Sequence, residues 1–195
     1  KKLEEVGSVI NGLTYSPDDI HDDGVLVLQC HSLGMYKLRE LLVQAFRQVM
    51  GDKLQAIYDK SADLVRKVSD GEKQEKKYLF GEATPHFIAE NDLQFWVDWE
   101  EGQKTGFFID QRENRQYLGE LAKNKKILNT FCYSGGFSIY ALNNGAKEVH
   151  SLDSSQKAID LLEDNLSFVA DFSDNHISII DDAKEYMKNL DDQYD

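Results

Sequence analysis

Hydrophobic positions follow two rhythms along this chain. In the first half, plausible strands at Val25–Cys30 and Leu54–Tyr58 flank a run with helical period from about Met35 to Met50. The segments His86–Ala89 and Leu93–Trp99 then alternate apolar and polar residues, as a half-buried hairpin does. Together these elements predict a small α+β domain. The apolar face expected for its helix consists of Leu38, Leu41, Leu42, Ala45, Phe46 and Val49.

From Gly106 onward, helical and strand patterns alternate. Such alternation predicts a parallel sheet with right-handed crossovers, in which ligands bind beyond the carboxyl ends of the strands. Asp110 and Glu113 have the spacing of a capping box, so the first helix is expected to begin there. The expected helices are Asp110–Ala122, Phe137–Asn144 and Gln156–Phe168, and the expected strands are Ile127–Phe131, Glu148–Leu152 and Ile177–Ile180.

The first of these strands runs into a glycine turn with a helix directly behind it, the layout that nucleotide-type cofactors use. Gly135 and Gly136 remove two side chains where a ligand would approach the backbone. The alternative is an ordinary strand–turn–helix corner whose glycines allow tight packing. These residues alone leave both interpretations open.

Acidic residues end the next two strands. Asp153 follows Gly136 by 17 positions and is placed to accept hydrogen bonds from ribose hydroxyls, or it is simply a surface aspartate. Asp182 could accept a hydrogen bond from an adenine amino group, with Ala183 leaving room for the ring, or it could cap a helix. Asp153 is therefore the best single candidate for cofactor binding.

The turn favours an adenosyl group over a dinucleotide. It lacks the G-x-G-x-x-G spacing. Phe137 stands at the start of the helix, where a pyrophosphate would place its negative charge and where a phenyl ring offers it no favourable contact. S-adenosylmethionine (SAM) carries no phosphate and tolerates this arrangement. Arg112 and Arg115, three positions apart on one helical face, could clamp a carboxylate or phosphate, or could be exposed and pair with Glu113 or Glu120.

Composition narrows the class of protein. Of the 195 residues 41% are hydrophobic and 29% are charged, and neither an apolar run of roughly 20 residues nor a basic-then-apolar leader is present, so we expect a cytoplasmic protein with no membrane partner. Cys30 and Cys132 form no CxxC pair and the histidines have no ligand spacing, so no metal site is expected. The net charge of −13 works against broad nonspecific binding of nucleic acid.

Three segments resemble the bacterial class I SAM-dependent ribosomal RNA methyltransferases, and most closely the 23S rRNA cytosine-C5 type. They are Lys104–Arg115 (KTGFFIDQRENR), Leu128–Ser138 (LNTFCYSGGFS) and Ser151–Ser155 (SLDSS). Ser61 to Asp63 with Arg66 and Lys67 also resembles a motif of the family's central domain. The family combines an RNA-binding PUA domain, a small central α+β domain and a Rossmann-like catalytic domain. The likeness covers roughly Val25 to Asp195.

This resemblance implies a SAM pocket. The Tyr133–Phe137 loop would cradle the methionine part, Asp153 with its neighbour Ser154 would meet the ribose, and Asp182 would lie near adenine. The residues implied at the methionine end are Phe107, Phe108, Gln111 and Arg112, and those of the loop are Tyr133, Ser134, Gly135, Gly136 and Phe137.

The resemblance also sets the expected domains. Residues 1–24 form an irregular segment, 25–103 the central α+β domain, and 104–195 the first half of a Rossmann-like α/β methyltransferase domain. The resemblance places the family's catalytic cysteine after Asp195 and not at Cys132, which lies in the cofactor loop. A PUA domain is not expected within residues 1–24. We therefore expect the chain to contain a cofactor half-site of a protein that acts on 23S rRNA, and to be incomplete as a catalyst.

Three other functions stay open on the sequence. They are a guanine-directed rRNA methyltransferase, a small-molecule methyltransferase on the same fold, and a binding module without chemistry. A homodimer is also left open.

Overall fold

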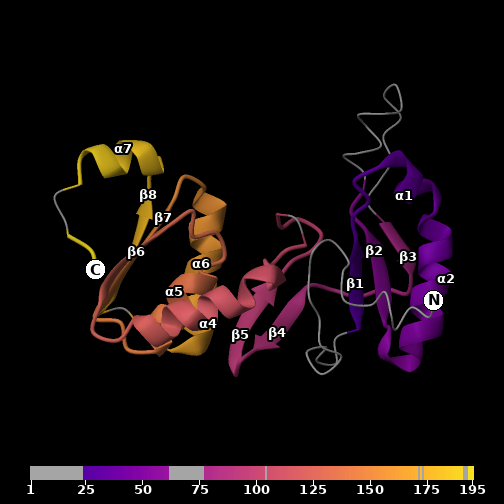
Figure 1. Ribbon diagram of the computed structural model, residues 1–195, viewed down its shortest axis with the longest axis horizontal. Coiled ribbons are helices and arrows are strands. Elements are labelled where there is room, and N and C mark those ends of the chain that lie inside the picture. The colour runs from indigo at the N-terminus through magenta and orange to yellow at the C-terminus, as the bar shows by residue number, and fades with distance from the viewer. Residues whose placement is uncertain (1–23, 62–76, 104, 171, 173, 191–192) are drawn as a thin grey trace. The chain divides into compact units, whose positions relative to one another are not determined.

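The computed structural model describes residues 24–61, 77–103, 105–170, 172, 174–190 and 193–195 (Figure 1). The chain divides into two compact units. The first comprises Lys1–Ile88 and Val97–Phe108, and the second comprises Ala89–Trp96 and Ile109–Asp195. The motif expected between Ser61 and Lys67 lies, beyond its first residue, outside the described residues.

A three-stranded sheet and a helix pair make up the described part of the first unit. Strands β1 and β2 pair in parallel with Val25 opposite Ala56, while β3, which the sequence pattern did not predict, pairs antiparallel with β2. The elements are β1 (Val25–Leu28), α1 (Leu33–Lys37), α2 (Arg39–Met50), η3 (Gly51–Lys53), β2 (Ala56–Asp59) and β3 (Lys77–Phe80).

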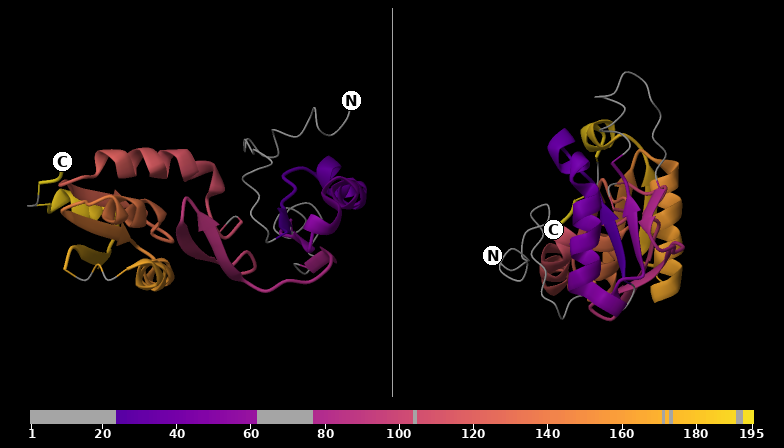
Figure 2. Two further views of the ribbon diagram at one scale, coloured as in Figure 1. Left: turned by 90° about the horizontal axis from the view of Figure 1, so that it is seen from below. Right: turned by 90° about the vertical axis from the view of Figure 1, so that its right-hand side faces the viewer.

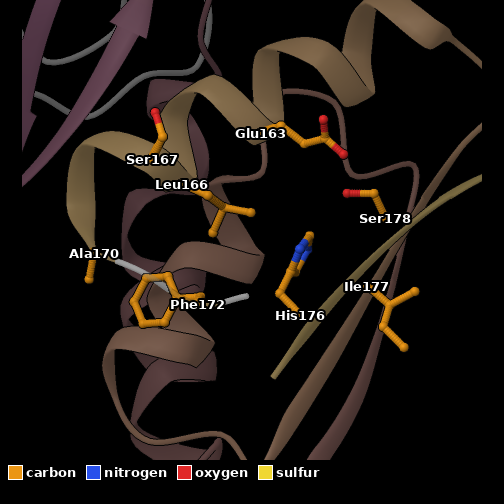
Figure 3. Close-up of a pocket in the computed structure, with 8 residues that line it drawn as sticks. All are labelled: Glu163, Leu166, Ser167, Ala170, Phe172, His176, Ile177 and Ser178. Atoms are coloured by element: carbon orange, nitrogen blue, oxygen red, sulfur yellow. The ribbon is translucent and has the colours of Figure 1, made fainter. Parts of the chain in front are cut away.

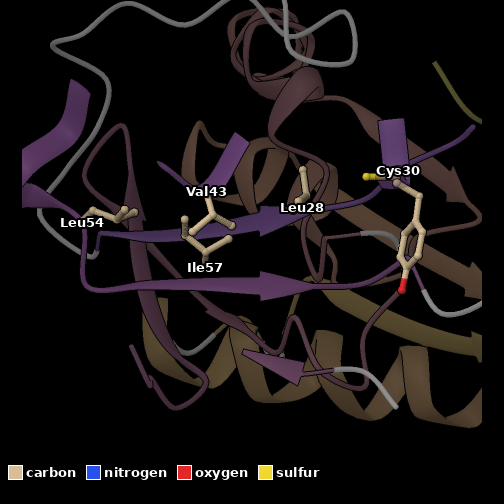
Figure 4. Packing of buried hydrophobic residues seen from close by; sticks show 6 residues of the cluster. Leu28, Cys30, Val43, Leu54 and Ile57 are labelled. Atoms are coloured by element: carbon tan, nitrogen blue, oxygen red, sulfur yellow. The ribbon is translucent and has the colours of Figure 1, made fainter. Parts of the chain in front are cut away.

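Two details of the predicted helix are wrong. Ser32 caps a separate short helix, because its side chain accepts a hydrogen bond from the Met35 backbone N–H, and Leu38 separates that helix from α2. Leu38, Leu41 and Val49 are exposed, so the predicted apolar face is rotated relative to the buried one. Helix α2 lies beside the sheet (Figure 2) and contributes Val43 to a core with Leu28, Cys30, Tyr36, Leu54 and Ile57 (Figure 4).

The second unit contains the parallel sheet that the alternation predicted. Strands β6, β7 and β8 pair in this order, with Lys126 opposite Glu148 and Val149 opposite His176. The elements are η4 (Ile109–Gln111), α4 (Arg112–Leu121), β6 (Lys126–Thr130), α5 (Gly136–Asn143), β7 (Glu148–Asp153), α6 (Gln156–Val169), β8 (His176–Ile180) and α7 (Ala183–Lys188). This mixed α/β unit confirms the predicted fold class. No helix among the described residues has the length and apolar character needed to cross a bilayer.

The start of α4 differs from the prediction. Ile109–Gln111 form a 3-10 turn, and Gln111 occupies the cap position without a side-chain cap hydrogen bond. The predicted capping box at Asp110 is therefore wrong, because the chain is still in the tighter turn where the box would have to form. Helices α5 and α6 pack on β7, and α4 packs on α5.

A hairpin joins the two units in the sequence, and its tip packs in the second unit. Its strands are β4 (His86–Glu90) and β5 (Leu93–Val97), close to the predicted bounds. Leu93, Phe95 and Val97 are buried, which confirms the predicted alternation. The ring of Phe95 stacks on that of Tyr140 in α5, with centroids 6.3 Å apart.

A buried ion pair fastens the hairpin tip to α4. Arg115 donates from Nε and Nη2 to the two carboxylate oxygens of Glu90, at 2.8 and 2.6 Å, and only 2% of Arg115 is exposed. Tyr140 donates to Glu90 Oε1 at 3.0 Å and accepts from Asn91 Nδ2 at 3.0 Å. Burial and the charge of Glu90 raise the pKa of Tyr140, which keeps its hydroxyl protonated as a donor. The exposed position considered for Arg115 is therefore wrong, and the carboxylate that Arg115 clamps belongs to the protein itself.

Arg115→Met tests this ion pair. We expect the second unit to lose about 3–5 kcal/mol of unfolding free energy, because the substitution leaves the Glu90 carboxylate buried without its partner. Urea unfolding followed by circular dichroism measures the loss. The matched control is Lys188→Met, which removes an exposed pair with Glu185 and should cost less than about 0.5 kcal/mol. Equal effects of the two variants would contradict the assignment.

A second polar group crosses the parallel sheet beneath α5. Asn129 Nδ2 donates to Ser138 Oγ at 2.8 Å, Ser138 and Ser151 hydroxyls lie 2.7 Å apart, and Ser151 Oγ lies 2.8 Å from His176 Nε2. Burial, with a smaller contribution from His150, lowers the pKa of His176 to about 4. The imidazole is therefore neutral in the folded protein at neutral pH.

The pKa of His176 predicts a loss of stability in mild acid. Because the unfolded chain binds this proton at a pKa near 6.5 and the folded chain only near 4, stability is fully present above pH 6.5 and falls as the pH decreases through this window. The expected loss is about 2 kcal/mol, after discounting the partial exposure of the ring. Urea midpoints of the parent and of His176→Gln across this range provide the measurement, and a variant with an unchanged pH profile would refute the prediction.

Candidate functional site

The carboxyl ends of the three parallel strands bring the predicted cofactor residues to one edge of the sheet. Thr130 is opposite Leu152 and Asp153 is opposite Ile180, so the loop after β6 lies beside the end of β7. The loop after β8 follows at the same edge. This is the position at which open α/β sheets bind ligands.

Asp153 is the acceptor around which this edge is arranged. Its Oδ2 accepts the Tyr133 backbone N–H at 3.1 Å, and its Oδ1 accepts the Ser155 backbone N–H at 3.0 Å. One half-buried carboxylate therefore holds both the glycine loop and the turn into α6. An ionised carboxylate offers about four lone-pair positions, so each oxygen can still accept a hydroxyl.

The loop between β6 and α5 has an unusual backbone. Phe131, Tyr133 and Gly135 all have positive φ angles, of 58°, 45° and 79°. For the two aromatic residues this conformation costs on the order of 1–2 kcal/mol each, so surrounding contacts must hold it. The Cys132 N–H donates to the Leu152 carbonyl at 3.1 Å, which adds to the hold from Asp153. Strained backbone of this kind is concentrated at ligand sites.

Gly135 has a packing role. A Cβ at this position would lie 2.8 Å from Leu162 Cγ, and its φ of 79° is in the left-handed region. For Gly135 the structure thus supports tight packing as the reason for glycine. Gly136 is the buried first residue of α5, and Phe137 is half-buried in the first turn. Ser134 is buried, and its carbonyl accepts a hydrogen bond from Asn165 Nδ2 at 3.0 Å.

Two capping roles are now resolved. Ser155 caps α6, since its side chain accepts from the Ala158 N–H, while Ser154 is exposed beside Asp153. Asp182 caps α7, because its Oδ1 accepts the N–H groups of Lys184 and Glu185 at 2.9 and 3.1 Å. The capping role does not test a contact between Asp182 and adenine, which stays a prediction.

The residues expected at the methionine end belong to different units. Phe107, which is 2% exposed, and Phe108 are in the first unit, whereas Gln111 and Arg112 are in the second. Gln111 Oε1 accepts from Asn114 Nδ2 at 2.9 Å at the start of α4. A wall formed jointly by these four residues stays a prediction.

Cys132 is in the loop but is unsuited to nucleophilic attack. Burial, followed by the nearby charge of Asp153, raises the pKa of its thiol to about 12. The reactive form of a cysteine is the thiolate, which is scarce at neutral pH when the pKa is that high. The identity of the catalytic group itself stays a prediction.

A groove elsewhere on this unit is separate from the cofactor edge. Its volume is about 720 Å³, and it lies between the C-terminal half of α6 and the beginning of β8 (Figure 3). It is lined by Glu163, Leu166, Ser167, Ala170, Phe172, His176, Ile177 and Ser178. Because α6 returns from the carboxyl to the amino ends of the strands, the groove is at the end opposite Asp153.

The cofactor edge fits an adenosyl group. It offers a half-buried carboxylate with free lone pairs beside a loop whose backbone turns sharply, and sugar hydroxyls are the donors that such a carboxylate accepts. Sequence reasoning found this carboxylate and placed Asn165 on the buried side of the helix after β7, but it gave Asn165 no role in supporting the loop. The available signal was an asparagine within the apolar face of α6.

Gly135→Ala tests the packing of the loop. We expect a loss of about 2–4 kcal/mol, because the new methyl group meets Leu162 and the backbone must hold an unfavourable φ. Gly34→Ala in helix α1 is the control, because the nearest neighbour of its new Cβ would be Ser32 Oγ at 4.0 Å. This substitution should be neutral or stabilising. Thermal and urea unfolding measure both variants, and a neutral Gly135→Ala would contradict the packing role.

Curated relatives of this chain are methyltransferases by name. The chain is 44% identical to ribosomal RNA large subunit methyltransferase I of Aeromonas salmonicida over 126 residues, which cover 64% of this chain and 31% of that protein. It is 43% identical to the Aliivibrio fischeri protein of the same name over 125 residues, covering 63% of this chain and 31% of that protein. The chain therefore spans about a third of the length of these relatives.

Solved structures show the same fold. A Streptococcus mutans protein assigned as a SAM-dependent methyltransferase matches with a TM-score of 0.72 and 26% identity, covering 85% of this chain and 42% of that one. A methyltransferase complexed with SAH matches with a TM-score of 0.71, 26% identity and the same coverage.

The profile of the S-adenosylmethionine-dependent methyltransferases matches residues 37–182, which span both units and include the glycine loop, Asp153 and Asp182. The chain belongs to the S-adenosylmethionine-dependent methyltransferase family.

Proposed function

We propose that this chain binds SAM for an enzyme that methylates ribosomal RNA of the large subunit. The observation that carries the proposal is the Asp153 carboxylate, held by the Tyr133 and Ser155 N–H groups beside the glycine loop. Relatives at 44% and 43% identity bear the name of large-subunit rRNA methyltransferases, which supports RNA as the substrate class. The bound cofactor would supply a methyl group on a sulfonium centre.

The residues of this chain bind and orient that cofactor. Asp153, with Ser154 beside it, would accept hydrogen bonds from the ribose hydroxyls, and the Tyr133–Phe137 loop, which Asp153 holds through the Tyr133 N–H, would surround the methionine part. Asp182 caps α7 with its Oδ1. Its carboxylate would also accept a hydrogen bond from the adenine amino group. The family resemblance further assigns Phe107, Phe108, Gln111 and Arg112 to the methionine end of the cofactor.

Within this proposal, the target is carbon 5 of a cytosine in 23S rRNA, with a guanine-directed enzyme as the alternative. Methylation at this carbon uses a thiolate that attacks the adjacent ring carbon. Neither cysteine of this chain has the character of such a group, because both are buried and burial raises the pKa of both Cys30 and Cys132. The proposal therefore assigns the role of nucleophile to neither of them.

Calorimetry tests the cofactor assignment. The chain should bind SAM and not NAD, and Asp153→Asn should weaken SAM binding by about 10- to 100-fold, because it removes a charged acceptor and one of its two backbone hydrogen bonds. The matched control is Asp160→Asn on the exposed side of α6, which should bind as the parent does. Binding of NAD in place of SAM, or equal affinities for the two variants, would overturn the assignment.

The substrate is identified in the cells that express the protein. Deletion of the gene for this protein should remove one methylated nucleoside from digested 23S rRNA, as detected by mass spectrometry, and re-expression of the protein should restore that nucleoside. Loss of 5-methylcytidine supports the cytosine assignment, and loss of a methylguanosine supports the alternative. If every rRNA modification is unchanged, the RNA assignment fails and a small-molecule substrate or a module without chemistry takes its place.

A further inference from the structure

Asn165 is a polar side chain in the apolar interior of the second unit. It lies in the middle of α6, between Leu162 and Leu166, and its exposure is 0%. A buried amide is costly unless its donor and acceptor are both satisfied. Asn165 satisfies both with backbone groups from two segments that are distant in the sequence.

The two hydrogen bonds connect the hairpin to the glycine loop. Oδ1 accepts the Trp96 backbone N–H at 2.7 Å, and Nδ2 donates to the Ser134 carbonyl at 3.0 Å. The backbone groups fix which end of the amide faces which partner, because an N–H can only donate and a carbonyl can only accept. A side chain at this position therefore needs one acceptor and one donor at the spacing of an amide.

The Ser134 carbonyl belongs to a peptide group that is critical for the loop. The same peptide group carries the Gly135 N–H, which donates to the Cys132 carbonyl at 2.8 Å. Asn165 and Cys132 thus hold this peptide plane from opposite sides. Asp153 holds the Tyr133 N–H, which belongs to the peptide group two positions earlier. The positive φ angle of Tyr133 lies between these contacts, and that of Gly135 follows directly after them.

We propose that Asn165 is a positioning residue for the cofactor loop and that it sets the loop's place relative to the hairpin backbone. This inference rests on the proposed function and deepens it. The hairpin tip is itself anchored by the buried Glu90–Arg115 pair, so Asn165 connects the loop to a rigid support. Asp153 holds the loop from the sheet, and Asn165 holds it from the helix and hairpin.

Asn165→Asp is the most informative variant, because it keeps the shape and the acceptor for Trp96. When ionised, the carboxylate cannot donate to the Ser134 carbonyl and repels it. We expect the SAM affinity of this variant to fall about ten-fold or more at pH of about 8.5, where the carboxyl is ionised. The affinity should recover towards pH of about 6, because burial raises the pKa of a carboxyl and the protonated form can donate to the Ser134 carbonyl. Asn165→Ser, whose single hydroxyl on a shorter side chain cannot bridge both backbone partners at any pH, should show the same loss without recovery.

The control is Asn144→Asp. Asn144 Nδ2 also donates to a backbone carbonyl, that of Tyr140 at 2.8 Å, but at the far end of α5 from the loop. Calorimetry with SAM at the two pH values is combined with amide hydrogen exchange at Gly135, which reports on the loop without any ligand. Exchange at Gly135 should accelerate in Asn165→Asp and Asn165→Ser and stay unchanged in Asn144→Asp.

Each outcome decides the proposal. Parent-like SAM affinity and Gly135 exchange in folded Asn165 variants would overturn it, and so would a loss in Asn165→Asp that persists at the lower pH. If the parent itself binds no SAM, the proposed function fails, and the exchange at Gly135 then decides whether Asn165 positions the loop. Circular dichroism confirms that each variant is folded.

Discussion

The site depends on the Asp153 carboxylate, which accepts hydrogen bonds from two backbone N–H groups. The loop before α5 carries aromatic residues at positive φ, a conformation that it would not hold by itself. A charged acceptor at the end of β7 compensates for this cost, because hydrogen bonds to an ionised group are stronger than neutral ones. The same carboxylate fixes the start of α6, so strand, loop and helix meet at one side chain.

The parallel register makes this arrangement possible. Since β6 and β7 pair with Thr130 opposite Leu152, the loop that follows β6 must pass beside Asp153. The buried positions of α5 and α6 then bring Ile139 and Leu162 into the core with β7. Gly135 is part of this packing, because Leu162 occupies the space that any side chain there would need.

Buried polar groups determine where the hairpin and the loop lie relative to the sheet. Glu90, Arg115 and Asn165 are all removed from solvent, and each is satisfied by groups from another segment. A side chain of this kind tolerates few alternative arrangements, because any shift leaves a polar atom without a partner. Hydrophobic packing supplies the bulk of the stabilisation, and these contacts select one geometry from those that packing permits.

The sequence alone determined the alternation of strands and helices, the parallel sheet, the glycine turn and the aspartate that follows the next strand. Each of these has a local signature in periodicity or in spacing along the chain. It also carried the motifs by which the family was identified.

Only the tertiary structure decided that Arg115 pairs with Glu90, that Gly135 makes room for Leu162, and that Asn165 joins Trp96 to Ser134. These partners are separated by 25 to 69 positions, so no local pattern in the sequence shows which residue pairs with which. Contacts of this kind form only when packing brings distant segments together, and the residues that shape the loop of the cofactor site were therefore recognised in part from the sequence and in part from the fold.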